Sequence, residues 1–334
     1  MKVAFYMNCV STHQLPLAKE VDALVDEFTY VYEGEGDQAY QRVDDVGDIV
    51  VKKIGVESRC RAELEDSDLL LSGLRDLELF ERRAKKGLKT FYTSERWFKP
   101  PLGRFRMLVP GYRRMVKRFV AWVNTDPGAR VLAIGPWAKR DFLRMGVKLD
   151  KIVDWGYYVE PSHALPAEKA DGSLRLLWCG RLLGWKRVGD IVRAVGEHVG
   201  LKRVGISLTI VGDGSEKDRL MEMAATIPGV TFLPSQSPEK IRELMRQHDT
   251  FVLASNGYEG WGAVVSEALE EGMNVIGTYE AGASAAMLPT DRLYHAGDVK
   301  VLARLLEAEY RGELPACSIG EWTAKRAAER LVRI

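Results

Sequence analysis

One stretch decides how this chain folds: Ser255-Asn-Gly-Tyr-Glu259-Gly-Trp-Gly262-Ala-Val-Val-Ser-Glu267-Ala-Leu-Glu-Glu-Gly272. The apolar run Thr250 to Ala254 that precedes it has the length of a short buried strand. After it, Ala263, Val264, Glu267 and Ala268 recur at helical spacing. The stretch therefore predicts a strand, a glycine-rich turn and a helix that begins near Gly262.

A turn of this kind leaves backbone N–H groups unpaired at a helix N-terminus, where the helix dipole favours an anion. Glu259 lies in the turn and Glu267 about one turn into the helix, so both carboxylates can point into one cleft. A carboxylate accepts two hydrogen bonds and can hold neighbouring sugar hydroxyls. The alternative is a tight strand-to-helix turn with solvated acids.

The same stretch resembles the signature of glycosyltransferase family 4. The resemblance rests on Glu259 and Glu267, separated by seven residues, on Gly260 and Gly262 between them, and on the sequence Glu267-Ala-Leu-Glu-Glu-Gly272. Family members are retaining enzymes of GT-B fold that use nucleotide-sugar donors. The resemblance implies an α/β chain of two Rossmann-like doubly wound domains facing across a cleft, with a C-terminal helix that crosses back to the first domain.

Basic and glycine-rich loops precede this stretch in the order that the family shows. The predicted strand Leu174 to Cys179 runs into Gly180-Arg181-Leu-Leu-Gly-Trp-Lys186, where an Arg and a Lys could neutralise a diphosphate. A solvated basic loop is the alternative. The strand Ile206 to Val211 runs into Gly212-Asp-Gly214, and Val230 to Leu233 runs into Pro234.

The resemblance assigns a role to each of these positions. It implies that Arg181 and Lys186 hold the diphosphate, that Glu267 holds the ribose, and that Glu259 holds the donor sugar. Catalysis then depends on Arg181, Lys186 and Glu259, and the backbone near Pro234 lies at the base. The expected donor-binding set is Gly180, Gly212, Gly214, Pro234, Gly260, Gly262, Ala263, Val264 and Glu267.

Composition limits the function classes. The chain has 334 residues, of which 46% are hydrophobic and 28% charged, and this suits a globular protein of two domains. A formal net charge of +1 argues against general nucleic-acid binding. Four scattered cysteines have no metal-ligand spacing. With neither a signal peptide nor an apolar membrane span in sight, we expect a cytoplasmic protein. We expect no cofactor or metal, because Arg181 and Lys186 would supply the positive charge.

Strand and helix patterns alternate from the N-terminus onward, as in a doubly wound domain. We expect strands at Val3 to Met7, Ser67 to Leu71, Leu88 to Tyr92 and Ala129 to Ile134, and helices at Leu17 to Phe28, Leu74 to Lys86 and Pro136 to Met145. The expected division is a compact acceptor-binding domain at 1–160, a linker at 161–173, a nucleotide-sugar domain at 174–318 and a crossover helix at 319–334.

Two residues of the first domain are candidates for contact with a sugar or an acceptor. His13 follows the first strand, where open α/β sheets bind ligands, although a lone loop His is often structural. Many family members carry a His after a later strand, but Thr93-Ser-Glu-Arg-Trp-Phe98 has none here. Glu95 is the best substitute, with an ion-paired structural role as the alternative.

Basic residues gather between Arg96 and Arg118, where eight of them occur without an acid and alternate with apolar residues. Such a surface suits an anionic membrane or a lipid diphosphate, and a partly buried helix with a solvated basic rim is the alternative. Pro and Gly residues break any single long helix here. The candidates for membrane or lipid contact are Arg104, Arg106, Arg113, Arg114, Lys117 and Arg118.

We therefore expect a retaining glycosyltransferase that moves a sugar from a UDP or GDP sugar to a glycan or lipid-linked acceptor, in polysaccharide or glycolipid synthesis. It could also lie on the inner membrane face as a peripheral protein. The alternatives are a nucleotide-sugar epimerase or hydrolase of the same fold, and an inactive nucleotide-sugar-binding protein.

Overall fold

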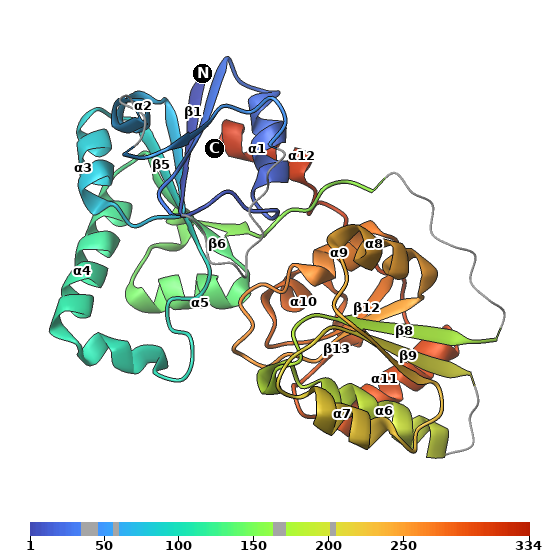
Figure 1. The fold of residues 1–334 in the computed structure, drawn as a ribbon. Helices are drawn as coiled ribbons and strands as arrows, with labels where there is room; N and C mark the ends of the chain where they lie inside the picture. The colour runs from blue at the N-terminus through green and yellow to red at the C-terminus, as the bar shows by residue number, and fades with distance from the viewer. Residues whose placement is uncertain (35–45, 56–59, 163–171, 201–204) are drawn as a thin grey trace. The chain divides into compact units, whose positions relative to one another are not determined.

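The computed structural model describes residues 1–34, 46–55, 60–162, 172–200 and 205–334. The chain forms two compact units (Figure 1). Unit 1 comprises Met1–Glu160 and Glu321–Ile334, and unit 2 comprises Pro161–Gly320. The last helix of the chain is therefore part of unit 1. Of the linker expected at 161–173, residues 163–171 lie outside the described residues.

Unit 1 is built on a seven-stranded sheet in the order β3-β2-β1-β4-β5-β6-β7, with every neighbouring pair parallel. Its strands are β1 (Lys2–Met7), β2 (Glu27–Tyr32), β3 (Val51–Lys53), β4 (Leu69–Ser72), β5 (Lys89–Ser94), β6 (Ala129–Ile134) and β7 (Ile152–Trp155). The central strands are apolar and buried because helices cover both faces of the sheet.

The helices of unit 1 form two layers (Figure 1). One layer is α2 (Cys60–Asp66), α3 (Leu77–Lys85), α4 (Pro110–Thr125) and α5 (Pro136–Met145); the other is α1 (Leu15–Asp22) with α12 (Ala324–Arg333). Short 3-10 helices occur at η1 (Gly103–Leu108) and η2 (Leu149–Lys151). An aromatic core between the sheet and the first layer includes Trp97, Phe119 and Phe142.

The expected helix from Leu17 to Phe28 was wrong at its C-terminal end. Helix α1 ends at Asp22, and Phe28 lies in β2. The run Glu27 to Tyr32 is rich in aromatic and β-branched residues, which favour a strand. Phe28 and Tyr30 pack around Phe5 of the neighbouring strand β1, so tertiary packing fixes the strand.

Unit 2 repeats the same design with a six-stranded parallel sheet in the order β10-β9-β8-β11-β12-β13. Its strands are β8 (Leu174–Cys179), β9 (Ile206–Val211), β10 (Val230–Leu233), β11 (Thr250–Leu253), β12 (Asn274–Thr278) and β13 (Leu293–Tyr294). Both units therefore have the doubly wound α/β organisation that the sequence predicted.

The helices of unit 2 also lie on both faces of the sheet (Figure 1). One layer is α6 (Val188–Gly200), α7 (Lys217–Ala224) and α11 (Val299–Tyr310); the other is α8 (Pro238–Gln247), α9 (Val264–Glu270) and α10 (Gly282–Met287). Short 3-10 helices occur at η3 (Gly184–Lys186) and η4 (Thr290–Arg292). No helix among the described residues has the length and apolar character needed to cross a membrane.

Two glycines let the loops after β8 and β9 approach each other closely. A Cβ added to Gly212 would lie 1.9 Å from the carbonyl oxygen of Gly180, and one added to Gly214 would lie 2.4 Å from that of Leu182. The Leu182 N–H donates to the Asp213 carbonyl at 2.7 Å. Only glycine allows this contact, because Gly212 and Gly214 also have φ of +143° and +152°.

We predict that Gly212→Ala lowers the free energy of unfolding of unit 2 by about 2 kcal/mol or more, since it combines backbone strain with a clash against main chain. Denaturant unfolding measures the loss. The matched control is Gly312→Ala, where φ is +69° but a Cβ meets nothing within 4 Å. That variant should lose only about 1 kcal/mol. Equal losses in the two variants would contradict the steric argument.

Candidate functional site

The candidate site lies at the carboxyl edge of the sheet in unit 2. Strand order reverses there, because β8 pairs with β9 on one side and with β11 on the other. Ligands of open α/β sheets bind at such a reversal, outside the carboxyl ends of the strands. The loops that leave β8 and β11 at this point carry Arg181, Lys186 and Glu259.

An ion pair and a backbone hydrogen bond tie these two loops together. The Lys186 Nζ lies 2.5 Å from the Glu259 Oε2, with the two side chains 18% and 11% exposed. The Asn256 N–H donates to the Trp185 carbonyl at 3.0 Å. The ammonium of Lys186 also lies 4.4 Å from the centre of the Trp185 ring. Lys186 is therefore held in place before any ligand arrives.

Arg181 differs from Lys186 in that its side chain is exposed and forms no ion pair with the residues described. It follows Gly180, whose φ of +146° turns the chain sharply at the end of β8. Since the charges of Lys186 and Glu259 offset each other, Arg181 is the uncompensated positive charge of the three. An anionic group is the ligand that this charge would attract.

Glu267 lies in α9, and its side chain is half-buried. Burial raises its pKa, and Arg242 opposes this to a smaller extent. No described residue donates a hydrogen bond to the carboxylate. The thiol of Cys179, at the end of β8, is close enough that burial and the charge of Glu267 both raise its pKa. A half-buried carboxylate without a donor can accept hydrogen bonds from the hydroxyls of a ligand.

Helix α9 begins at Val264, two residues later than expected. Gly262 has φ of +87° and therefore cannot belong to the helix, and Ala263 is the N-cap residue. The helix is only seven residues long, so its dipole contributes less than the sequence suggested. The turn is fixed instead by the Glu259 N–H, which donates to the Asn256 carbonyl at 2.9 Å.

The other expected donor-binding residues surround the same edge of the sheet. Gly260 packs against the start of α10, where a Cβ on Gly282 would lie 2.6 Å from its carbonyl oxygen. Pro234 follows β10 on the outer side of β9, and its carbonyl accepts a hydrogen bond from Gln236 Nε2 at 3.1 Å. Sequence reasoning missed Trp185, Asn256 and Cys179, although Trp185 stands directly before Lys186.

The two candidates of unit 1 lie near each other. His13 follows β1 and Glu95 follows β5, and the charge of Glu95 acts on the imidazole. Burial lowers the pKa of His13, and the ring stacks on Tyr157 with centroids 5.6 Å apart. Glu95 forms an ion pair with Lys99. His13 is therefore a neutral, packed imidazole at neutral pH, with a carboxylate in its surroundings.

The described residues hold no metal cluster at these positions. In the described parts of the chain, no three His, Cys, Asp or Glu gather as metal ligands. Asp66 and Asp68 flank one residue, but Asp66 pairs with Lys86 and Asp68 accepts the Lys2 N–H.

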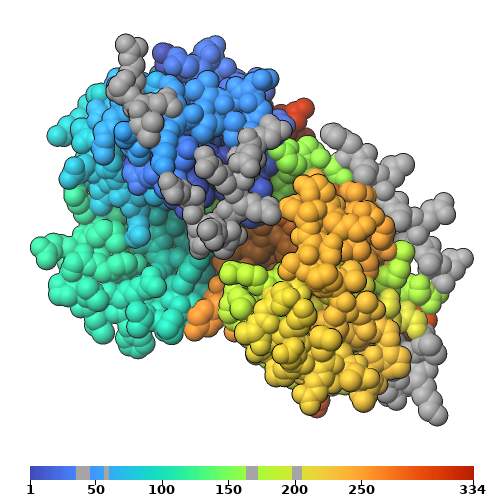
Figure 2. Space-filling model, viewed as in Figure 1, coloured from blue at the N-terminus to red at the C-terminus, as the bar shows by residue number. Residues whose placement is uncertain are grey.

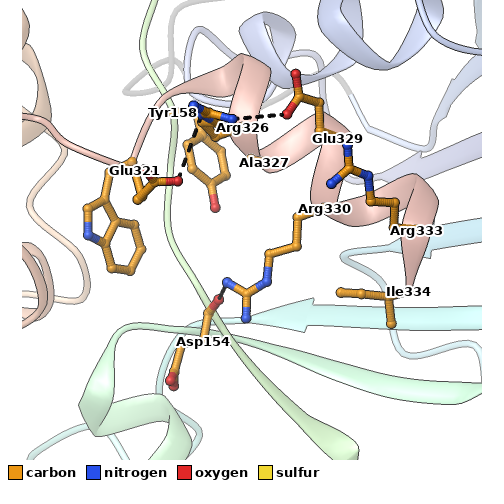
Figure 3. Close-up of a pocket in the computed structure, with 10 residues that line it drawn as sticks. Asp154, Tyr158, Glu321, Arg326, Ala327, Glu329, Arg330, Arg333 and Ile334 are labelled. Carbon is orange, nitrogen blue, oxygen red and sulfur yellow. Dashed lines mark hydrogen bonds and ion pairs between the residues drawn. The ribbon is translucent and has the colours of Figure 1, made fainter.

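A pocket of about 540 Å³ lies along α12 in unit 1 (Figure 3). Its guanidinium groups are largely engaged: Arg326 lies between Glu321 and Glu329, and Arg330 donates to the Asp154 carbonyl at 3.1 Å.

Comparison with known families identifies unit 2. Residues 173–308 match the sequence model of the family described as Glycosyl transferases group 1. The match covers less than half of the chain, and it shows that unit 2 is similar to that family. The matched range contains both loops of the candidate site, from Gly180 to Glu267. The chain is therefore a glycosyltransferase, and comparison with the curated proteins gives no significant match.

Solved structures of similar fold cover the whole chain. The lipopolysaccharide outer core galactosyltransferase WaaB has a TM-score of 0.70 at 17% identity, covering 100% of this chain and 98% of that one. HepE from Anabaena in complex with UDP-glucose has a TM-score of 0.62 at 15% identity, covering 100% and 95%. The apo structure of OtsA has a TM-score of 0.64 at 12% identity, covering 100% and 96%. These likenesses show that the glycosyltransferase has the GT-B fold.

We predict that Glu267→Gln makes the ligand-free protein more stable at pH 7. Because the folded-state pKa is raised, the folded protein binds more protons than the unfolded chain just above pH 4.5. The ionised carboxylate therefore costs stability as the pH rises through that window, and the amide avoids the cost.

Urea unfolding at several pH values measures this difference, which should disappear as the pH falls below 4.5. Glu222→Gln, an exposed carboxylate on α7 in the same unit, is the control and should change little. A Glu267→Gln variant that is less stable than the wild type at pH 7 would contradict the account of a half-buried carboxylate without a donor.

Proposed function

We propose that this glycosyltransferase takes a sugar from a nucleotide diphosphate sugar and transfers it with retention of anomeric configuration. The observation that carries the proposal is the arrangement at the strand reversal of unit 2. An uncompensated Arg181, a Lys186 paired with Glu259 and a half-buried Glu267 without a hydrogen-bond donor lie on two adjoining loops and the helix that follows. A nucleotide sugar presents a diphosphate, a ribose and a hexose, which match these three features.

The charges suggest how the leaving group is stabilised. A breaking glycosidic bond places negative charge on the diphosphate, which needs fixed positive groups nearby. Arg181 supplies a full positive charge with several donors. Lys186 has three N–H donors, and its contact with Glu259 occupies one, so the others remain for the diphosphate. The second oxygen of Glu259 remains for a hydroxyl of the donor sugar.

Glu267 is proposed to bind the ribose. Its carboxylate lacks donors in the ligand-free protein, and the two ribose hydroxyls would provide them. The Pro234 backbone is proposed to lie at the edge of the base, and Gly212 and Gly214 bring the main chain close to the nucleotide. The comparisons favour uridine donors as the first to test, because HepE was crystallised with UDP and with UDP-glucose.

The acceptor is proposed to be a glycan or a lipid-linked sugar, as in polysaccharide or glycolipid synthesis. WaaB, whose fold is similar, acts on lipopolysaccharide outer core, and this supports an acceptor of that class. In unit 1, the neutral His13 and the nearby Glu95 are proposed to contact sugar or acceptor hydroxyls. No metal or cofactor takes part in the proposed reaction.

The experiment that tests this function is calorimetric titration with UDP, GDP, ADP and their glucose conjugates. We predict that one diphosphate series binds and that 100-fold excess over its dissociation constant raises the free energy of unfolding by about 2.7 kcal/mol. Incubation of that donor with acceptors, followed by NMR of the anomeric proton, then checks retention. Free monosaccharide or epimerised donor without acceptor would indicate a hydrolase or epimerase instead. Binding without turnover on any acceptor would indicate an inactive binding protein.

We predict that Arg181→Ala lowers kcat/KM about 100-fold to 1000-fold, since it removes a fixed positive charge from the leaving group. Steady-state kinetics with the donor identified above measure the loss. Arg304→Ala removes an exposed arginine from α11 in the same unit and should leave kcat/KM within about twofold. An Arg181→Ala enzyme with unchanged kcat/KM would show that the diphosphate lies elsewhere.

A further inference from the structure

A second surface of unit 1 carries exposed apolar side chains that the donor site does not use. Eleven large hydrophobic side chains are exposed in the described parts of the chain, and four of them lie between residues 102 and 109. Leu102 is 56% exposed, Phe105 73%, Leu108 78% and Val109 58%. Phe105 and Leu108 are the two most exposed of the eleven. We call these four residues the apolar tip.

The local backbone explains why the apolar tip faces outward. Residues Gly103–Leu108 form the 3-10 helix η1, which has three residues per turn and therefore stacks side chains three apart on one face. Leu102, Phe105 and Leu108 follow this spacing. Met107, on a different face, packs against the core of unit 1. The segment is thus anchored by one side chain while the other three project into solvent.

Basic side chains adjoin the apolar tip. In α4, Tyr112, Met115 and Val116 pack on the core, whereas Arg113, Arg114 and Lys117 share the opposite, exposed face. Arg104 is exposed within η1 itself. None of these four forms an ion pair with the described residues. No acidic residue occurs from Arg96 to Thr125, so nothing in the segment offsets their charge.

The other two basic candidates do not belong to this face. Arg118 makes two hydrogen bonds of 2.6 Å to the carboxylate of Glu81, and Arg106 is half-buried beside Tyr112. Arg118 is therefore part of a solvent-exposed ion pair at the rim of the helix. In Figure 2 the teal-green atoms around residues 102 to 118 lie on the visible surface of unit 1.

We propose that the apolar tip and the four basic side chains dock unit 1 on an anionic lipid membrane. Phe105 and Leu108 would insert at the boundary between headgroups and acyl chains, and Arg104, Arg113, Arg114 and Lys117 would bind lipid phosphates. Charge complementarity selects this occupant, because several unpaired cations directly beside apolar side chains match a surface whose anionic plane covers an apolar interior. The proposal concerns a surface of unit 1 and stands independently of the donor site in unit 2.

Vesicle co-sedimentation of the full chain tests the proposal. We predict that the protein binds vesicles of three parts phosphatidylcholine to one part phosphatidylglycerol at low salt. Binding to phosphatidylcholine alone should be at least tenfold weaker, and 0.5 M NaCl should release the protein by screening the phosphates. The double variant Phe105→Ser/Leu108→Ser and the charge reversal Arg113→Glu/Arg114→Glu should each weaken binding at least tenfold.

Matched variants show whether the effect belongs to this surface. Leu149→Ser changes a 62% exposed leucine elsewhere in unit 1, and Arg144→Glu/Lys148→Glu reverses two exposed charges beside it. Both should bind vesicles like the wild type. Denaturant midpoints and nucleotide titrations of the tip variants should be unchanged, because these side chains support neither the core nor the donor site.

Absence of binding to anionic vesicles would overturn the proposal, as would binding that the tip variants leave unchanged. Binding that is lost equally in the Leu149 variant would also overturn it. If the wild type ignores vesicles but forms a complex with an acidic protein that depends on Arg113 and Arg114, the surface is a protein interface rather than a membrane one.

Discussion

The close approach of main chain to main chain at Gly212 and Gly180 is the constraint on which the donor site depends. With β8 and β9 paired in register through Cys179 and Val211, the loops that leave them would diverge if either carried a Cβ at the contact. Glycine at 212 and 214 brings the second loop against the first, and the Leu182 N–H to Asp213 carbonyl bond fixes them. The position of Arg181 is therefore set by backbone, which relaxes far less than side chains do.

The second constraint is the ion pair between Lys186 and Glu259, which joins the loops after β8 and β11 at the strand reversal. The Lys186 and Glu259 pair costs side-chain entropy and partial desolvation, so its value as a source of stability is small. Its consequence for binding is larger. A lysine held by a carboxylate loses little further entropy when a phosphate arrives, and the carboxylate is held at the same edge of the sheet. Leaving Arg181 without a partner keeps one net positive charge for an anionic ligand.

Much of this could be predicted from sequence, and the failures have identifiable causes. The runs 129–134, 174–179 and 206–211 are mainly apolar and bounded by glycine or turn residues, and the structure places strands at those bounds. The prediction that the helix continues after Asp22 was wrong, because packing on Phe5 decided the conformation of that run. The partner of Lys186 was not predictable as an ion pair, because it lies 73 residues away and meets Lys186 only through strand order. Similarly, Pro and Gly residues showed that the basic segment was broken, but only the 3-10 geometry of η1 shows which apolar residues face solvent.

Exposure of the apolar tip to water is energetically unfavourable, and the packing of unit 1 explains why the tip stays exposed. Four neighbouring apolar side chains exposed to water are unfavourable on the surface of a soluble monomer. A flexible loop would fold them inward onto the protein. Here the chain cannot do so. Trp97 and Phe98 are buried before the segment, Met107 is anchored within it, and Phe119 and Trp122 are buried in α4 after it. Since the aromatic core fixes both ends and the middle, the outward face of η1 is a consequence of how unit 1 packs. The exposure of the apolar tip is therefore as much a property of the folded state as the partial burial of Glu267.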